Sequence, residues 1–194
     1  MRDPRLQAFL NSLEVSLLES PHTFPGRHVA EMVFRALGDA PGEPQETESA
    51  DLPVLECLGR AVEIAKTESS RTQPIGAALE PLLPHLPWRR SKGYDDPAFI
   101  EGHANAVLVG NGGLERRSDF TIGISLAAPN TAYPMHNHPP EELYLTMAGG
   151  EFRHGEDDWT RVGTGETFYN TPGIIHAMRA TADPLLAIWV FGQR

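Results

Sequence analysis

The sequence predicts a mostly β protein with an N-terminal α-helical region, because the spacing of its apolar residues changes about halfway along the chain. From about Ala104 onward, apolar residues form short runs that are separated by Gly, Pro, Asn and Asp, the residues favoured in turns. Strands spaced in this way are typical of an antiparallel sandwich or a small barrel. Near the N-terminus the apolar residues instead follow the i, i+3, i+4 spacing of a helix: Leu6, Phe9, Leu10, Leu13, Leu17 and Leu18.

Four helices are expected in the first half of the chain. Asp3 and Pro4 fit the N-cap and the first turn of the first helix, and Gly38 fits the end of the second. Residues 39–50 are polar and rich in proline, so we predict a loop there. The expected helices span residues 5–19, 28–37, 51–66 and 75–83.

The second half is expected to contain five or more strands, in the runs ANAVLVG, FTIGISLAA, ELYLTMAGGEF, ETFYNT and LLAIWVFG. The segment PWRRSKGYDDPAFIEGH before them combines aromatic, charged and turn residues, so we interpret it as a linker or as a flap over a site. The predicted organisation is a helical region over residues 1–87, a linker or flap over 88–103, and a β-barrel over 104–194.

The composition limits the kinds of partner. A formal net charge of −10 argues against a nucleic-acid partner, because phosphate binding needs a basic surface. No apolar run approaches the roughly 20 residues of a membrane-spanning helix, so no membrane partner is expected. Cys57 is the single cysteine, so an internal disulfide is excluded. With no secretory signal pattern at the start, the expected location is the cytoplasm.

A dense group of ligand side chains lies in the stretch MHNHPPEELY, residues 135–144. Side chains alternate between the two faces of a strand, and His136, His138, Glu142 and Tyr144 all have even numbers. Pro139-Pro140 forces a bend, so a strand–turn–strand path can direct all four side chains to one side. Two imidazoles and a carboxylate that converge inside a barrel form a natural site for a divalent metal ion.

A further ligand is expected from another strand. His154 lies in RHGEDDW, a polar hairpin tip, and is a poor candidate. His176 follows a turn in NTPGIIHAMRA, next to apolar residues, and is a good one. The predicted metal ligands are therefore His136, His138, Glu142 and His176.

The spacing of these residues resembles the two motifs of the cupin superfamily. The first motif reads His-x-His-x3-Glu-x6-Gly from His136 to Gly149, and the second is GETFYNTPGIIH. The chain departs from the cupin pattern in three places, none of them a ligand, with Asn130 for Gly, Thr171 for Pro and Ala180 for Asn. The resemblance implies a C-terminal cupin barrel, that is, a jelly roll. Three histidines and a carboxylate accept iron(II), manganese(II), zinc, nickel or cobalt, and we favour iron(II).

Two tyrosines are candidates for a catalytic base. Tyr144 follows Glu142 by two residues and should point into the same cavity, and Tyr133 is expected at its mouth. A phenol next to a divalent cation loses its proton more readily, so either residue fits proton abstraction next to a carboxylate. The alternative is that both tyrosines only pack in the barrel, as their β-propensity allows.

The run from SLAAPNTAYPMHNHPPEELYLTMAGG to YNTPGIIHAMR resembles the cupin-type dimethylsulfoniopropionate (DMSP) lyases, in particular those of the DddQ type. This resemblance implies a β-elimination that converts DMSP into dimethyl sulfide and acrylate at a cupin-bound divalent metal. Tyr144 would be the first choice of base and Tyr133 the second. His138, Glu142 and His176 would hold the metal, with His136 as a fourth ligand or a near neighbour.

A sulfonium substrate is a cation without hydrogen-bond donors, so aromatic faces suit it, at about 0.5–2 kcal/mol per contact. The candidates for such contacts are Trp88, Tyr94, Phe168, Tyr169 and Trp189. Ordinary core packing of these rings is an equal alternative. Small cupins often dimerise, so a homodimer is compatible with the sequence, although no interface can be identified in it.

Two other functions fit the same ligand set. One is another metal-dependent cupin enzyme, a dioxygenase or an isomerase acting on a small acid. The other is a non-catalytic cupin that binds a small ligand and relays binding to a partner. Fold alone does not choose among them.

Overall fold

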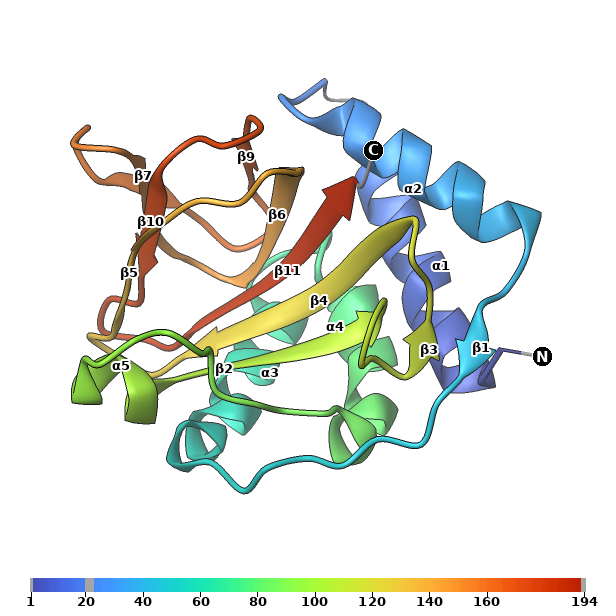
Figure 1. The fold of residues 1–194 in the computed structure, drawn as a ribbon, viewed down its shortest axis with the longest axis horizontal. Coiled ribbons are helices and arrows are strands. Elements are labelled where there is room, and N and C mark those ends of the chain that lie inside the picture. The colour runs from blue at the N-terminus through green and yellow to red at the C-terminus, as the bar shows by residue number, and fades with distance from the viewer. Residues whose placement is uncertain (1, 20–22, 193–194) are drawn as a thin grey trace.

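Two sheets and a group of helices form the molecule, which was analysed as a computed structural model that describes residues 2–19 and 23–192 (Figure 1). The N-terminal helices lie against one side of the larger sheet, and the smaller sheet faces the other side. The α-helices are α1 (Pro4–Leu18), α2 (Arg27–Asp39), α3 (Leu58–Thr67), α4 (Gln73–Leu79) and α5 (Pro97–Gly102), and two 3-10 helices are η1 (Pro53–Cys57) and η2 (Glu80–His85).

The larger sheet has seven strands, in the spatial order β1 (Glu43–Pro44), β3 (Glu115–Arg116), β2 (His103–Val109), β4 (Phe120–Ala127), β11 (Leu185–Gly192), β6 (Glu141–Ala148) and β9 (Thr167–Asn170). The smaller sheet has four, in the order β5 (Ala132–His136), β10 (His176–Arg179), β7 (Gly150–His154) and β8 (Thr160–Val162). Apart from the short β2–β3 contact, all described pairs are antiparallel. The predicted fold class, a mostly β chain with a C-terminal cupin barrel and an N-terminal helical region, is confirmed.

The helical half agrees with the sequence except at element ends. Asp3 Oδ1 accepts a hydrogen bond from the Arg5 backbone N–H at 2.8 Å and caps α1 as predicted. The helix expected over 51–66 begins instead with the 3-10 turn η1, which has Pro53 at its first position. The helix expected over 75–83 changes to the 3-10 helix η2 at Glu80, which is followed by Pro81. Each proline removes a backbone donor and favours a start or a break there.

The loop predicted over residues 39–50 contains a short strand. Glu43 and Pro44 pair with Arg116 and Glu115 of β3, so β1 forms the edge of the larger sheet. An edge strand tolerates proline because its outer face needs no ladder partner. The composition of this segment gave no sign of the pairing, which depends on residues more than 70 positions away.

The run ELYLTMAGGEF forms two strands in different sheets. β6 ends at Ala148 in the larger sheet, and β7 begins at Gly150 in the smaller one. A Cβ at Gly149 would lie 2.8 Å from the Val162 carbonyl oxygen, so only glycine allows the backbones to approach this closely where the chain changes sheets.

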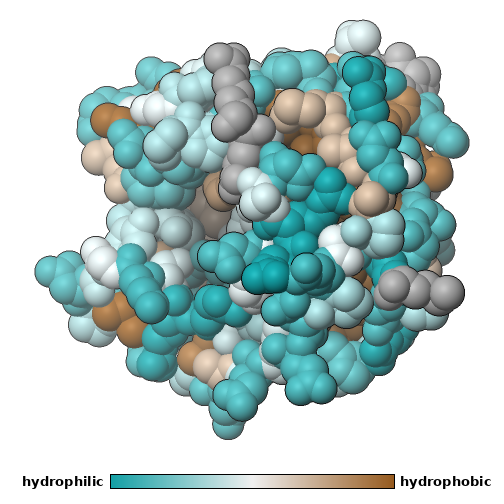
Figure 2. Space-filling model, turned by 45° about the vertical axis from the view of Figure 1, so that its right-hand side comes forward, coloured by the Kyte–Doolittle hydropathy of each residue, from teal (hydrophilic) through white to brown (hydrophobic). Residues whose placement is uncertain are grey.

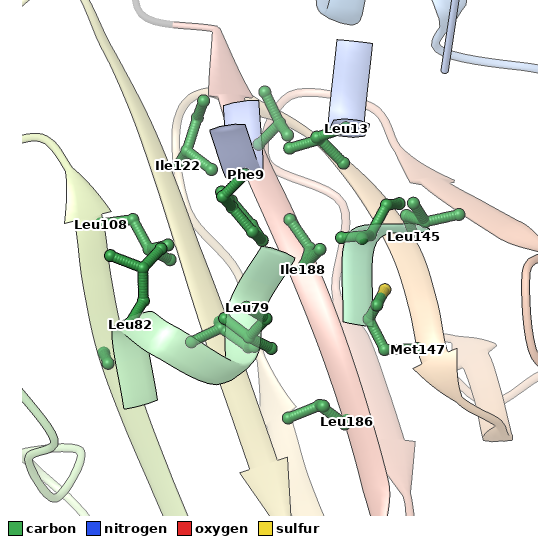
Figure 3. Close-up of a cluster of buried hydrophobic side chains, with 14 of the residues drawn as sticks. Phe9, Leu13, Leu79, Leu82, Leu108, Ile122, Leu145, Met147, Leu186 and Ile188 are labelled. Atoms are coloured by element: carbon green, nitrogen blue, oxygen red, sulfur yellow. The ribbon is translucent and has the colours of Figure 1, made fainter. Parts of the chain in front are cut away.

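The larger sheet buries both of its faces. Leu145 and Met147 of β6 and Ile188 of β11 lie on the face that the N-terminal helices cover, in one buried cluster with Phe9 and Leu79 (Figure 3). The alternate residues of the same strands, Tyr144 of β6 and Trp189 of β11, belong to a second buried cluster inside the barrel. The helices and the sheet therefore share one core, while the division at residues 88 and 104 stays a prediction.

On the face drawn in Figure 2, hydrophilic residues predominate, and hydrophobic residues appear as small separate spots. Across residues 2–19 and 23–192, no helix combines the length and the apolar character needed to cross a membrane.

Candidate active site

Two of the three histidines predicted to bind a metal ion lie on adjacent strands of the smaller sheet. His136 ends β5, His176 begins β10, and the two are direct partners in the ladder. His138 follows in the bend before β6. One ring nitrogen from each of the three lies within 4.8 Å of the others. The structure thus brings together residues 40 positions apart in the sequence, as the motif spacing predicted.

Backbone carbonyls fix the orientation of all three rings. Nδ1 of His136 lies 2.9 Å from the Pro134 oxygen, Nδ1 of His138 lies 2.8 Å from the Pro140 oxygen, and Nδ1 of His176 lies 3.0 Å from the Ile174 oxygen. A carbonyl oxygen can only accept, so each Nδ1 carries the hydrogen. Each Nε2 can therefore offer its lone pair to a cation, an arrangement typical of metal-binding histidines.

Glu142 lies beside two of these rings. Its Oε2 is 3.0 Å from His138 Nε2 and 3.3 Å from His176 Nε2, and its side chain is buried. Burial acts to raise the pKa of Glu142, but the neighbouring imidazoles outweigh this effect and lower it to about 2. The carboxylate is therefore ionised at neutral pH.

The histidines differ in their electrostatic environments. Burial, followed by the proximity of His176, lowers the pKa of His136 to about 4, so this ring is neutral at pH 7. Burial also acts to lower the pKa of His138, but the contact with Glu142 outweighs it and the pKa is raised. A cation next to Glu142 would compete with a proton on His138.

The donor set fits a divalent metal ion. His176 Nε2 is buried and has no hydrogen-bond partner among the described residues, although Glu142 Oε2 is only 3.3 Å away. A buried polar atom without a partner is unfavourable, and a cation that accepts the Nε2 lone pair would satisfy it. Three imidazoles and one carboxylate are ligands that zinc, iron(II) and manganese(II) all accept.

The two tyrosines lie beside different histidines of the cluster. Tyr144 is buried, and its ring centroid lies 6.5 Å from that of His176. Burial and the Glu142 carboxylate raise the pKa of Tyr144 well above its ordinary value. Tyr133 is only half-buried, its ring centroid lies 4.2 Å from that of His136, and its hydroxyl is 3.4 Å from Ser91 Oγ.

The segment interpreted as a linker or flap lies against Tyr133. The Tyr133 ring is contacted by Tyr94 at a centroid distance of 5.6 Å and by Phe99 at 4.7 Å. His103, at the start of β2, packs edge-on to the same ring at 4.6 Å, and burial lowers its pKa to about 3. Tyr94, Phe99 and His103 therefore surround the Tyr133 ring. His103 was not among the predicted site residues.

The other predicted aromatic residues do not all lie near the histidines. Trp189 pairs with Tyr144 across β11 and β6 and lies in the barrel cluster. Tyr169 pairs with Leu143, so it faces the helices, and its hydroxyl donates to Glu141 Oε2 at 2.7 Å. Trp88 is buried in the core under the helices. Tyr169 faces the helices because side chains alternate along a strand, and its even-numbered neighbours face the cavity.

Sequence reasoning missed two side chains next to the predicted ligands. The ring of Phe191 lies 4.5 Å from that of His138. Asn170 Nδ2 donates to Glu142 Oε2 at 2.8 Å. Both pair directly with Glu142 in the sheet, so strand pairing would have revealed them, but pairing is not visible in the local sequence.

One departure from the cupin motif has a conformational explanation. Asn130, where the motif usually has glycine, adopts a φ of 62°. This left-handed region favours glycine, and asparagine is among the few other residues that adopt it readily. The turn before β5 therefore keeps its shape without glycine.

The barrel and its converging histidines define a cupin with a candidate metal centre. Residues 26–187 match the family model of the dimethylsulfoniopropionate lyases. The chain therefore belongs to the dimethylsulfoniopropionate lyase family, and the resemblance seen in the sequence is confirmed.

Related proteins agree with this assignment. The chain is 30% identical over 125 residues to the DddL protein of Cereibacter sphaeroides, which carries the name of a dimethylsulfoniopropionate lyase. It is also 30% identical over 91 residues to the dimethylsulfoniopropionate lyase DddQ of Ruegeria pomeroyi. These matches cover 64% and 46% of this chain, and about half of each relative's length, 52% and 45%.

The crystal structure of DddQ from Ruegeria pomeroyi has the same fold, with a TM-score of 0.75 over 99% of this chain and 93% of that one, at 21% identity. A second crystal study, of the DMSP lyases RdDddP and RnDddQII, contains a chain that matches with a TM-score of 0.69 at 22% identity, over 97% of this chain and 92% of that one. At these identities the comparison shows a shared fold that includes the helical region.

Proposed function

We propose that this protein is a metal-dependent DMSP lyase, which cleaves dimethylsulfoniopropionate into dimethyl sulfide and acrylate. The proposal depends on the convergence of three imidazoles and the ionised Glu142 carboxylate beside the buried Tyr144 phenol. The chain that carries them belongs to the lyase family. The reaction is a β-elimination, in which a proton leaves the carbon next to the substrate carboxylate and the C–S bond breaks. The bonding electrons leave with sulfur, so neutral dimethyl sulfide needs no proton from the protein.

His136, His138, Glu142 and His176 are the residues proposed to hold the metal ion. When bound, a divalent cation supplies positive charge that stabilises the negative charge developing on the substrate carboxylate. Carbonyl contacts at each Nδ1 keep the three rings in place before substrate arrives. Little reorganisation is then needed at the moment of reaction.

Tyr144 is our first choice for the base that takes the proton, and Tyr133 is the second. Because burial and Glu142 raise its pKa, the Tyr144 phenol is protonated in the metal-free protein. Its role as a base therefore requires compensating positive charge in the cluster. Tyr133 is closer to the mouth of the barrel, where it could orient the substrate.

Aromatic faces on the cavity side are proposed to receive the sulfonium group. Tyr94 and Trp189 remain candidates, since Tyr94 contacts Tyr133 and Trp189 lies in the barrel cluster. Phe191, beside His138, is added to them. We propose that residues 88–103 act as a flap that limits access of water to this cavity.

Iron(II) is our proposed native metal, with zinc or manganese(II) as alternatives and nickel or cobalt also accommodated by the donors. A cytoplasmic location and a homodimeric state are also proposals, of which the first is supported by the single cysteine.

Headspace gas analysis after adding DMSP to purified, metal-analysed protein tests the activity. We expect equal amounts of dimethyl sulfide and acrylate. Treatment with EDTA should abolish both products, and iron(II) or manganese(II) should restore part of the rate. Activity that survives complete metal removal would refute the metal dependence. Oxygen consumption during turnover would instead identify a dioxygenase, since a lyase needs none.

A further inference from the structure

A chain of three buried or half-buried polar side chains leads away from the candidate metal site. Glu142 Oε2 lies 2.8 Å from Asn170 Nδ2, and Asn170 Oδ1 lies 2.9 Å from His154 Nε2. The three residues come from β6, β9 and β7, so the chain crosses from the larger sheet to the smaller one. No ligand role was expected for His154, and its nitrogen atoms are not part of the three-histidine cluster.

The direction of every hydrogen bond in this chain is determined. The carboxylate oxygen of Glu142 accepts, so the Asn170 amide must direct its NH2 group toward it. The Asn170 oxygen therefore faces His154 and accepts in turn. His154 Nε2 must carry the hydrogen, because an amide oxygen cannot donate.

Packing leaves these groups little freedom. Asn170 is 0% exposed and Glu142 is 1% exposed, so a rotated amide would leave buried polar atoms unpaired. The His154 ring lies 4.6 Å from the Phe168 ring, and His154 pairs directly with the predicted ligand His176 in the sheet. The strand that carries His176 thus also fixes the position of His154.

We propose that Asn170 and His154 are positioning residues, which hold the Glu142 carboxylate in the orientation that a bound metal ion requires. The inference rests on the proposed function, because it assigns these residues to the same metal site. A bound cation would take the Nε2 lone pairs of His138 and His176, so neither ring would donate a hydrogen bond to Glu142. The Asn170 amide faces the carboxylate from another strand, so its hydrogen bond would persist.

The expected effect is on metal affinity. Hydrogen-bond partners of metal ligands typically change metal affinity about 10- to 100-fold when they are removed. We expect a loss in that range when the chain is interrupted at His154 or at Asn170, with all four ligands still present.

Two substitutions of His154 separate hydrogen bonding from packing. His154→Gln keeps an N–H donor at a similar reach but removes the ring that contacts Phe168. His154→Phe keeps a ring against Phe168 but removes the donor. If His154 positions Asn170, the Gln variant should bind metal nearly as tightly as the wild type, and the Phe variant should bind about 10-fold or more weakly. If His154 only packs, the order is reversed.

The measurement is the affinity of metal-free protein for zinc ion, determined by competition with a chromophoric chelator in the absence of substrate. Asn170→Leu, which has a similar volume and no polar atoms, should match or exceed the loss in His154→Phe. Far-UV circular dichroism and the thermal midpoint of each metal-free variant check that it is folded. If Asn170→Leu does not fold, the two His154 variants still test the proposal. They are expected to fold because His154 is half-buried at the end of its strand.

The outcomes distinguish this inference from the proposed function. Suppose that the wild-type protein binds zinc. If His154→Phe then binds zinc as tightly as the wild type, or if His154→Gln binds more weakly than His154→Phe, the positioning roles are overturned and the proposed metal site is unaffected. A wild-type protein that binds no metal ion overturns both. Zinc binding without dimethyl sulfide formation overturns the proposed activity alone.

Discussion

At each clustered histidine, one backbone contact decides which ring nitrogen faces the others. The contacts of His136, His138 and His176 all involve a carbonyl only two residues away in the sequence. Local chain geometry therefore sets the tautomers, while the barrel sets the distances between the rings. This division explains why a short motif carries information about the orientation of the rings, since the carbonyl contacts that set it are local.

A first prediction concerns His176, the proposed ligand on the distant strand β10. His176→Ala removes one of the clustered imidazoles, so the protein should lose most of its metal as well as its turnover. Metal stoichiometry of the purified variant, measured by elemental analysis, checks this. His85→Ala, a change in η2 outside the cluster, serves as the control. If the His176 variant keeps a full complement of metal, the assignment of this ligand is wrong.

A second prediction separates binding from chemistry. Tyr144→Phe should keep its metal but lose turnover about 10²- to 10⁴-fold, the usual contribution of a general base. The readouts are metal content and the rate of acrylate formation, compared with Tyr133→Phe. Near-normal turnover in the Tyr144 variant, together with a large loss in the Tyr133 variant, would transfer the base role to Tyr133.

The sequence predicted more of the ligands than of their surroundings. His136, His138 and Glu142 were predicted from strand alternation within ten residues, and the structure places the two histidines in one cluster with Glu142 beside His138. Asn170 and Phe191 lie next to Glu142 only because β9 and β11 pair with β6. Pairing between strands distant in the sequence is not encoded in any local pattern, so these neighbours could not be predicted.

At the scale of the elements, the spacing of apolar residues predicted where helices and strands lie. It did not predict which strands pair or where the chain passes from one sheet to the other. The change of sheet at Gly149 and the edge strand at Glu43–Pro44 both depend on distant backbone. The same kind of close approach occurs in the centre of the larger sheet. Gly123 of β4 pairs directly with Trp189 of β11, and the indole occupies the space above the glycine.

A third prediction follows from this contact between strands. A Cβ at Gly123 would lie 2.1 Å from Trp189 Cζ2, so Gly123→Ala must displace the indole or the backbone of β4. We expect the free energy of unfolding to fall by about 1–3 kcal/mol, the usual effect of overpacking. Turnover should also fall, because Trp189 pairs with Tyr144 on its other side.

Chemical denaturation measures the change in stability. Gly59→Ala is the control, because Gly59 is exposed in α3 and nothing lies within 4 Å of the added methyl group. That helical substitution should raise the free energy of unfolding by about 0.5–1 kcal/mol. Equal effects of the two substitutions would contradict a specific clash with Trp189.

At the scale of the whole molecule, the helices and the barrel depend on each other. The outer face of the larger sheet is apolar and is covered by α1, α2, α3 and α4 in one continuous core. Without these helices, residues such as Ile122, Leu145 and Ile188 would be exposed to water (Figure 3). Burial of both sheet faces also keeps β6 in the register that directs Glu142 and Tyr144 into the cavity.

The last prediction tests this dependence with a residue far from the site. Phe9 of α1 is 0% exposed in the shared core, so Phe9→Ala should lower the free energy of unfolding by about 3–5 kcal/mol. Val15→Ala changes the same helix at a side chain that is 48% exposed, and should alter stability by no more than about 0.5 kcal/mol. Because the core is continuous, far-UV circular dichroism and tryptophan fluorescence should report one coincident transition for both variants. A barrel that stays folded after the helices have unfolded would show instead that the helical region is a separate domain.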